Sequence, residues 1–332
     1  MKVAIINDTR PTRHYGCLMV MSNLERLLQK HGAEVIWTWP VSQDWRKHKD
    51  KIEAMPEVDM ILVNGEGTIH HAPRRWQAQA LLEFAAFSHQ TLKRPCYLIN
   101  ATLYANEDNC IAHLNDFDEI YVRDRASFET LTQQGVAARL VMDLTFAFEP
   151  SVPYQPESGR ICVVDSVMQT DVPWLKKFKK HWQCPYRSMV VARPDNYNFW
   201  KRPRKTIVET VKWFFRDRNK SLDPAEFEAF LSGCELVVTG RYHTVTMCLK
   251  NKIPFVALES NTPKISFLLK EVFGHTDRVM PSKSLLTLNP QDWASFSKEE
   301  AMAMDRFLNQ ARDDNAAMVE TLLARTKGMG TL

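Results

Sequence analysis

Residues 236–258 read LVVTGRYHTVTMCLKNKIPFVAL. Apolar, β-branched runs at 235–239 and 254–258 predict two buried strands, and the segment 242–251 between them has the length of a helix. Two strands joined by a helix pair in parallel, because the helix returns the chain to the same end of the sheet. This segment therefore predicts one unit of a parallel α/β sheet.

The same alternation of short apolar runs and helix-length segments covers most of the chain. We expect further strands at 2–6, 34–39, 58–63, 96–101, 119–123, 139–142, 160–165 and 188–192. We expect further helices at 18–28, 76–92, 126–134, 172–182, 205–218, 224–231 and 263–273, and one or two more at 297–327. This order of elements is typical of a doubly wound α/β protein.

Residues 149–159, EPSVPYQPESG, hold three prolines and a glycine and predict a linker. We therefore expect a Rossmann-like N-terminal domain at 1–150, a Rossmann-like C-terminal domain at 160–290 and a helical tail at 291–332. In such a fold, ligands bind beyond the carboxyl ends of the strands, here in a cleft between the two parallel sheets.

The composition of the 332-residue chain excludes several classes of protein. With 45% hydrophobic and 25% charged residues, it is neither disordered nor fibrous. Its apolar runs are shorter than the about 20 residues of a membrane span, and MKVAIINDTR lacks the features of a signal peptide. Seven widely spaced cysteines without a Cys-x-x-Cys pair predict reduced thiols in the cytoplasm. We expect no metal site, because no His, Asp or Cys cluster has ligand spacing.

The formal net charge is +4, but residues 160–220 hold 15 Lys and Arg against 5 Asp and Glu. A local positive field predicts an anionic ligand or surface, and the low overall charge argues against nucleic acid. In WLKKFKKHW (174–182) the aromatic residues follow helical spacing, which predicts a contact at the inner face of the membrane or simply a solvated face. In ARPDNYNFWKRPRK (192–205), Arg193 and Lys201 are candidate contacts for an acceptor sugar or an anion.

The stretch VDMILVNGEGTIHH (58–71) ends a strand in Asn64, Gly65, Glu66 and Gly67. Glycines there let backbone N–H groups approach a ligand. The pattern is neither a P-loop nor the dinucleotide fingerprint. Glu66 is a candidate catalytic carboxylate pointing into the cleft, and His70 is a candidate acceptor or anion contact. The alternative is a tight turn with a solvated glutamate.

Other candidates follow other predicted strands. Arg123 is either an anion clamp or a neighbour of a helix cap, and Asp143 is either a catalyst or a turn residue. At the start of helix 242–251, Arg241 and free N–H groups suit a carboxylate or phosphate, and His243 suits a general acid. His14, in NDTRPTRHYG, is a candidate acceptor or anion contact.

The segments NGEGTIHH, VRDRAS, MDLTF and VVTGRYHTVTMCLKNKIPFVAL, in this order, resemble the polysaccharide pyruvyl transferase family. This resemblance implies a GT-B-like fold and transfer of the pyruvyl group of phosphoenolpyruvate onto two hydroxyls of a sugar or glycolipid acceptor, as a ketal. It implies a phosphoenolpyruvate site at Arg241 and His243, with Arg123 as a second anion contact and no cofactor. The donor site would also include Asn64, Gly65, Gly67 and Tyr242.

The sequence departs from the family pattern at Asn-Gly-Glu-Gly and at Tyr242, where the usual residue is Leu. Glu66 facing Asp143 would also suit a retaining glycosyltransferase with a nucleotide-activated donor, such as a CMP-Kdo-dependent Kdo transferase. In pyruvyl transfer, His243 would protonate the methylene carbon and Glu66 or Asp143 would act as the base. A third alternative is an inactive carbohydrate-binding protein.

Overall fold

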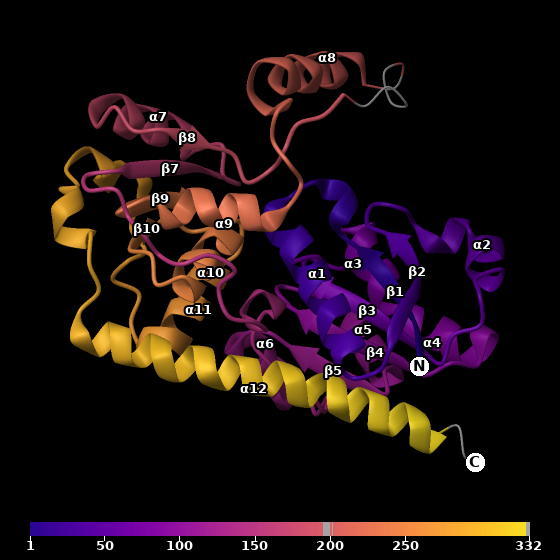
Figure 1. Cartoon of the computed structure of the whole chain (residues 1–332). Helices are drawn as coiled ribbons and strands as arrows, with labels where there is room; N and C mark the ends of the chain where they lie inside the picture. The colour runs from indigo at the N-terminus through magenta and orange to yellow at the C-terminus, as the bar shows by residue number, and fades with distance from the viewer. Residues whose placement is uncertain (195–199, 201, 330–332) are drawn as a thin grey trace.

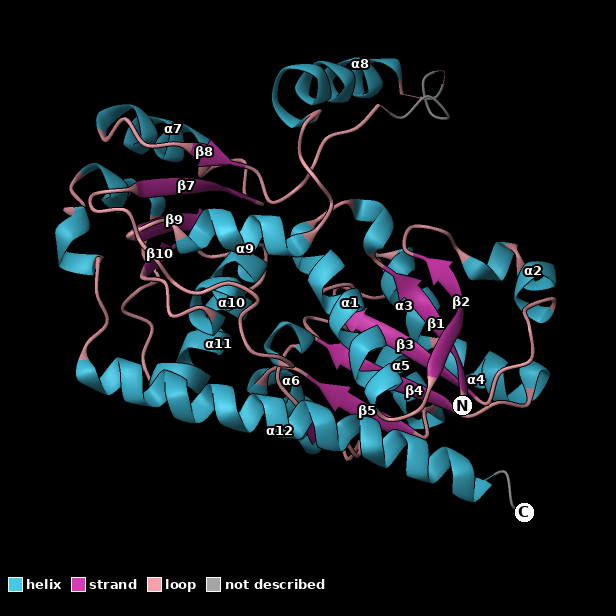
Figure 2. Ribbon diagram, in the orientation of Figure 1, coloured by secondary structure: helices cyan, strands magenta, loops and turns pink. Residues whose placement is uncertain are grey.

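The computed structural model describes residues 1–194, 200 and 202–329 and contains two parallel sheets (Figures 1 and 2). The six-stranded sheet has the order β2-β1-β3-β4-β5-β6 and the four-stranded sheet the order β10-β9-β7-β8. The strands of the first are β1 (Lys2–Asp8), β2 (Glu34–Pro40), β3 (Met60–Glu66), β4 (Cys96–Ala101), β5 (Glu119–Val122) and β6 (Arg139–Leu140). Those of the second are β7 (Ile161–Ser166), β8 (Tyr186–Arg187), β9 (Leu236–Gly240) and β10 (Phe255–Ala257).

Helices connect the strands, as the alternating sequence pattern predicts. They are α1 (Tyr15–Lys30), α2 (Lys49–Glu53), α3 (Trp76–Leu82), α4 (Phe84–Phe87), α5 (Asp108–Ile111), α6 (Arg125–Gln133), α7 (Val172–His181), α8 (Pro203–Lys212), α9 (Pro224–Ser232), α10 (Tyr242–Lys250), α11 (Lys264–Phe273) and α12 (Lys298–Met329). The helix expected at 76–92 is divided into α3, α4 and a π-helical turn at Ser88–Leu92. No helix in the described part of the chain is long and apolar enough to cross a membrane.

The strand expected at 188–192 is not part of the sheet, and this prediction was wrong. The backbone there bonds instead to the start of α1: Tyr15 donates its N–H to the Met189 carbonyl at 3.0 Å, and Val191 donates to the Arg13 carbonyl at 3.0 Å. His14 and Val190 form an isolated antiparallel bridge. The apolar run therefore docks the first half of the chain onto the second.

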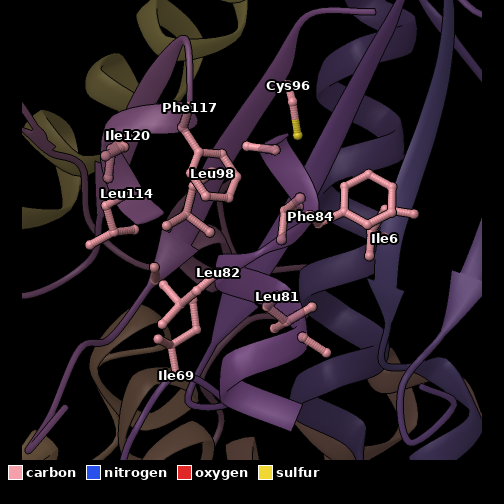
Figure 3. Packing of buried hydrophobic residues seen from close by; sticks show 14 of the residues in the cluster. Ile6, Ile69, Leu81, Leu82, Phe84, Cys96, Leu98, Leu114, Phe117 and Ile120 are labelled. Carbon is pink, nitrogen blue, oxygen red and sulfur yellow. The ribbon is translucent and has the colours of Figure 1, made fainter. Parts of the chain in front are cut away.

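Alternating side chains of the first sheet are buried on both of its faces. Ala4 and Ile6 pack with α3 and α4, in the cluster that Figure 3 shows around Phe84 and Leu98. Val3 and Ile5 point to the opposite face, where α1 and α12 cover them. Burial on both faces explains why these strands are almost continuously apolar in the sequence.

The C-terminal tail is one helix that packs against both halves of the protein (Figure 1). Its first part buries Met304 and Leu308 in the core beside α10 and α11. Its later part buries Val319 and Leu322 against the first sheet. Since one rigid helix contributes to both cores, α12 links the two sheets mechanically.

We expect Leu322→Ala to lower the free energy of unfolding by about 2–5 kcal/mol, because it leaves a cavity beneath the first sheet. Leu322 is fully buried. Met302→Ala, on the same helix but 61% exposed, should change it by less than about 0.5 kcal/mol. Urea denaturation measures both values, and equal effects of the two substitutions would show that α12 is not part of the core.

Candidate functional site

Three residues with left-handed backbone conformations mark the carboxyl edge of the first sheet. Asn7, Glu66 and Asn100 have φ values of 68°, 38° and 56° and lie at the ends of the adjacent strands β1, β3 and β4. Asparagine adopts this region more readily than other residues, but for Glu66 it is unfavourable, and such strain is concentrated at functional sites. The backbone conformation therefore indicates a functional site at this edge of the sheet, where the sequence predicts one.

Glu66 is buried at this edge and accepts three hydrogen bonds. Its carboxylate is contacted by Thr9 Oγ1 at 2.5 Å, Asn64 Nδ2 at 3.0 Å and the Cys17 thiol at 3.2 Å. It is only 4% exposed, so the alternative of a solvated glutamate in a turn was wrong. Three donors around one carboxylate hold it in a fixed orientation.

Arg123 and Asp143 form a fully buried ion pair next to Glu66. Arg123 Nη1 lies 2.5 Å from Asp143 Oδ2, and Arg123 Nε donates to Thr102 Oγ1 at 2.8 Å. The second Asp143 oxygen accepts from the Thr145 N–H at 2.9 Å. Burial alone would raise the pKa of Asp143, but the charges of Arg123 and His243 lower it below its usual value. Because the ion pair with Arg123 lowers its pKa, Asp143 is a weak proton acceptor and is better placed to orient its neighbours.

His243 brings the second half of the chain to this ion pair. Its Nε2 lies 3.8 Å from Asp143 Oδ2, has no hydrogen-bond partner and is buried. The imidazole packs on the backbone of Gly16, where a Cβ would stand 2.2 Å from His243 Cβ. The ring of His14 meets it edge-on, with the ring centroids 5.3 Å apart. Position 16 therefore has to be glycine for His243 to fit. The buried Nε2 of His243 is free to hydrogen-bond a bound ligand.

Lys264, at the start of α11, is a site residue that the sequence analysis missed. Its Nζ lies 5.8 Å from the Tyr242 ring, which also packs on Arg123. The Nζ would be 3.5 Å from a Cβ at Gly67. Burial and the charges of Arg123 and Arg241 lower its pKa to about 8. In the described structure no carboxylate forms an ion pair with Lys264. Its position shortly after the predicted strand 254–258 could have marked it as a candidate site residue in the sequence.

Arg241 is already paired with a carboxylate. Its Nη2 lies 2.5 Å from Asp165 Oδ2, at the end of β7, while its Nε is buried without a hydrogen-bond partner. Asp165 was not predicted, because it comes from a strand far away in the sequence. Arg241 can still offer its remaining N–H donors to an anion.

The other predicted residues have different surroundings. Burial and Arg75 lower the pKa of His70 to about 4, so His70 is a neutral contact near pH 7. A Cβ at Gly65 would stand 2.5 Å from that of Ala101, so this glycine serves close strand packing. Arg193 is exposed, and Lys201 lies outside the described residues.

Three ligand-type atoms converge where the sequence suggested no metal cluster. The ligand atoms of His14, Cys17 and His243 all lie within 4.8 Å of one another. Spacing along the chain could not reveal this group, because His243 joins it only through the fold. Such donors suit a borderline-soft ion such as zinc. The charges of Lys264 and Arg241, which help burial to lower the pKa of His14, instead favour an anion here.

The sequence model of the family described as polysaccharide pyruvyl transferase matches residues 14–262. The chain belongs to this family. No curated protein sequence is significantly similar to it.

Solved structures of low sequence identity share the fold. One is a putative UDP-N-acetylglucosamine 2-epimerase from Listeria monocytogenes, with 12% identity, a TM-score of 0.55 and coverage of 98% of this chain and 95% of that chain. Another is the UDP-GlcNAc 2-epimerase of Methanocaldococcus jannaschii in complex with UDP-GlcNAc and UDP, with 12% identity, a TM-score of 0.53 and coverage of 93% and 99%. These likenesses and the two parallel sheets confirm the predicted GT-B-like α/β fold. Membership of the polysaccharide pyruvyl transferase family indicates that the protein is a transferase.

We expect Asp143→Asn to lower the free energy of unfolding by about 3–5 kcal/mol, because it leaves Arg123 buried without a counter-charge. Glu271→Gln breaks the exposed pair with Arg125, which is worth about 0–1 kcal/mol, and serves as the matched control. Since the folded-state pKa of Asp143 is lowered, its contribution is present at neutral pH and is lost as the pH falls. Urea denaturation at neutral and acidic pH tests both points, and equal losses in the two variants would contradict them.

Proposed function

We propose that this pyruvyl transferase relative transfers the pyruvyl group of phosphoenolpyruvate to two hydroxyls of a surface-polysaccharide precursor. The donor carries a carboxylate and a phosphate close together, which calls for several cations. Arg123, Arg241 and Lys264 supply them around His243. The seven free cysteines agree with a cytoplasmic reaction.

The observation that carries this proposal is the unpaired positive charge of Lys264. Arg123 and Arg241 each have a carboxylate partner, but Lys264 has none among the described residues. A partly buried ammonium group without a counter-ion is costly and is stabilised when an anion binds. We place the donor between Lys264, Gly67 and His243.

The proposed reaction assigns each residue a separate task. One sugar hydroxyl adds to C2 of the donor, giving its proton to Glu66, while His243 delivers a proton to the C3 methylene. The C2–O bond to phosphate then breaks, and the second hydroxyl closes the ketal on C2. The proton of the second hydroxyl leaves with the phosphate, and the proton on Glu66 returns to His243. Asp143 keeps Arg123 and His243 in position throughout.

A glycosyl transfer with a nucleotide-activated donor is the second candidate, favoured by the buried carboxylate of Glu66. The two reactions differ in their products. Pyruvyl transfer releases inorganic phosphate from phosphoenolpyruvate, whereas the alternative releases a nucleotide. An inactive carbohydrate-binding protein would release neither.

We expect phosphate release from phosphoenolpyruvate in the presence of a panel of hexose and N-acetylhexosamine oligosaccharides. His243→Gln should reduce the rate by about 10²–10⁴-fold, because it removes the proton donor. The control His113→Gln changes a half-exposed histidine in the turn before β5, at the opposite end of this strand from Arg123, and should retain the wild-type rate. Release of CMP from an activated sugar, with no phosphate from phosphoenolpyruvate, would favour the alternative.

Affinity for phosphoenolpyruvate should fall as the pH rises through about 8, the pKa of Lys264. Of the three cations only Lys264 loses its charge in this pH range, so each pH unit above this value should raise Kd by up to about tenfold. Isothermal titration of the wild type and of Lys264→Met between about pH 7 and pH 9.5 measures this change. The variant should bind weakly with little pH dependence, and an unchanged pH profile would remove Lys264 from the donor site.

A further inference from the structure

Helix α8 and the π-helical turn that follows it at Trp213–Asp217 expose an apolar face to solvent. The side chains of this face are 50–82% exposed: Ile207, Val208, Val211, Phe214 and Phe215. The other four follow Ile207 by one, four, seven and eight positions along the chain, and this spacing places all five side chains on one side of the helix. Two aromatic and three aliphatic side chains in a row are unusual on a protein surface that meets only water.

The covered side of the same segment is largely polar. Thr206 and Asp217 are buried, Thr210 is partly buried, and the half-buried Trp213 lies between them. Asp217 anchors the segment by accepting the Ala192 N–H at 2.8 Å and pairing with Lys220 at 2.8 Å. The buried positions of this segment are therefore mostly polar while its apolar side chains are exposed, the reverse of the usual amphipathic helix.

The exposed charges around this face are all positive. In the described segment 202–218, every charged residue that is exposed rather than partly buried is Arg or Lys: Arg202, Arg204, Lys205, Lys212 and Arg218. Glu209 is partly buried and forms an ion pair with Lys212 at 2.8 Å. Figure 1 shows α8 standing away from the rest of the molecule, in agreement with the exposure of its five apolar side chains.

The aromatic and basic helix at 174–182, where we expected a membrane contact, does not have such a face. In α7, Leu175 and Phe178 are buried in the core of the second sheet, and Trp174 packs against the same cluster. The residues left outside are mainly lysines. The apolar stripe of this helix is therefore used for folding, although Trp182 at its end is 38% exposed, and α8 offers the larger exposed apolar face.

We propose that α8, with the turn at Trp213–Asp217, lies in the interface of an anionic lipid bilayer. An exposed apolar stripe flanked by Arg and Lys is the pattern of a helix that lies in the plane of a membrane. The apolar side chains enter the boundary of the acyl chains, and the cations contact lipid phosphates. A second copy of this chain fits less well, because pairing two identical faces brings like charges together.

This orientation has a consequence for the site. The segment joins the body between Ala192 and α9, beside residues 189–191, which bond to the start of α1. The residues His14 and Cys17 of the site belong to that same start of α1. Docking of α8 would therefore hold the site near the membrane surface, whatever donor the enzyme uses.

The test is co-sedimentation of the full chain with two kinds of vesicle, phosphatidylcholine alone and phosphatidylcholine with about one third phosphatidylglycerol. We expect binding to the mixed vesicles and at least tenfold weaker partition to neutral ones. The double variant V211D/F215D should lose at least tenfold in partition to the mixed vesicles, because it places two anions in the apolar face. Since both residues are exposed, its thermal unfolding should match the wild type.

Met302→Asp is the matched control, since it places an acid at another exposed apolar position, on α12. It should bind the mixed vesicles as the wild type does. Wild-type protein that stays in the supernatant with both vesicles, or V211D/F215D that sediments like the wild type, would overturn the proposal. A concentration-dependent dimer that V211D/F215D abolishes would show that a second copy, not lipid, covers the face.

Discussion

The buried ion pair of Arg123 and Asp143 is the interaction on which the site depends. Neither charge is in contact with water, so each is stable only because the other is present. The pair fixes the position of Tyr242, whose ring packs on the guanidinium, and faces His243 at the start of α10. The first half of the chain therefore supplies the buried ion pair, and the second half supplies His243, which faces it.

Two long helices make this meeting possible. The N-terminal part of α1 docks on the second half, where Tyr15 stacks on Phe227 with ring centroids 4.7 Å apart, and its later part covers the first sheet. The opposite end of the molecule is held by α12, which enters both cores. Since His14, Gly16 and Cys17 lie at the docked end of α1, any change in the packing of the two halves would move the site itself.

Helices α7 and α8 carry similar sequence patterns with opposite outcomes. Both combine apolar residues at helical spacing with several cations. The apolar side of α7 is covered by the second sheet, but that of α8 is exposed, and the buried residues of its segment include the polar Thr206 and Asp217. Periodicity identifies an amphipathic helix, but only the neighbours show which of its faces is free.

The sequence by itself determined the parallel sheets and the placement of Glu66, Arg123 and His243 at strand ends or helix starts, because strand and helix periods and glycine breaks are local properties. It did not determine their partners. Only the tertiary structure shows that Lys264, Cys17 and Asp165 belong to the site. It also shows that the run 188–192 lies outside the sheet and that the apolar face of α8 is exposed. These outcomes depend on contacts between distant segments, and neither spacing nor composition records which distant groups will be neighbours.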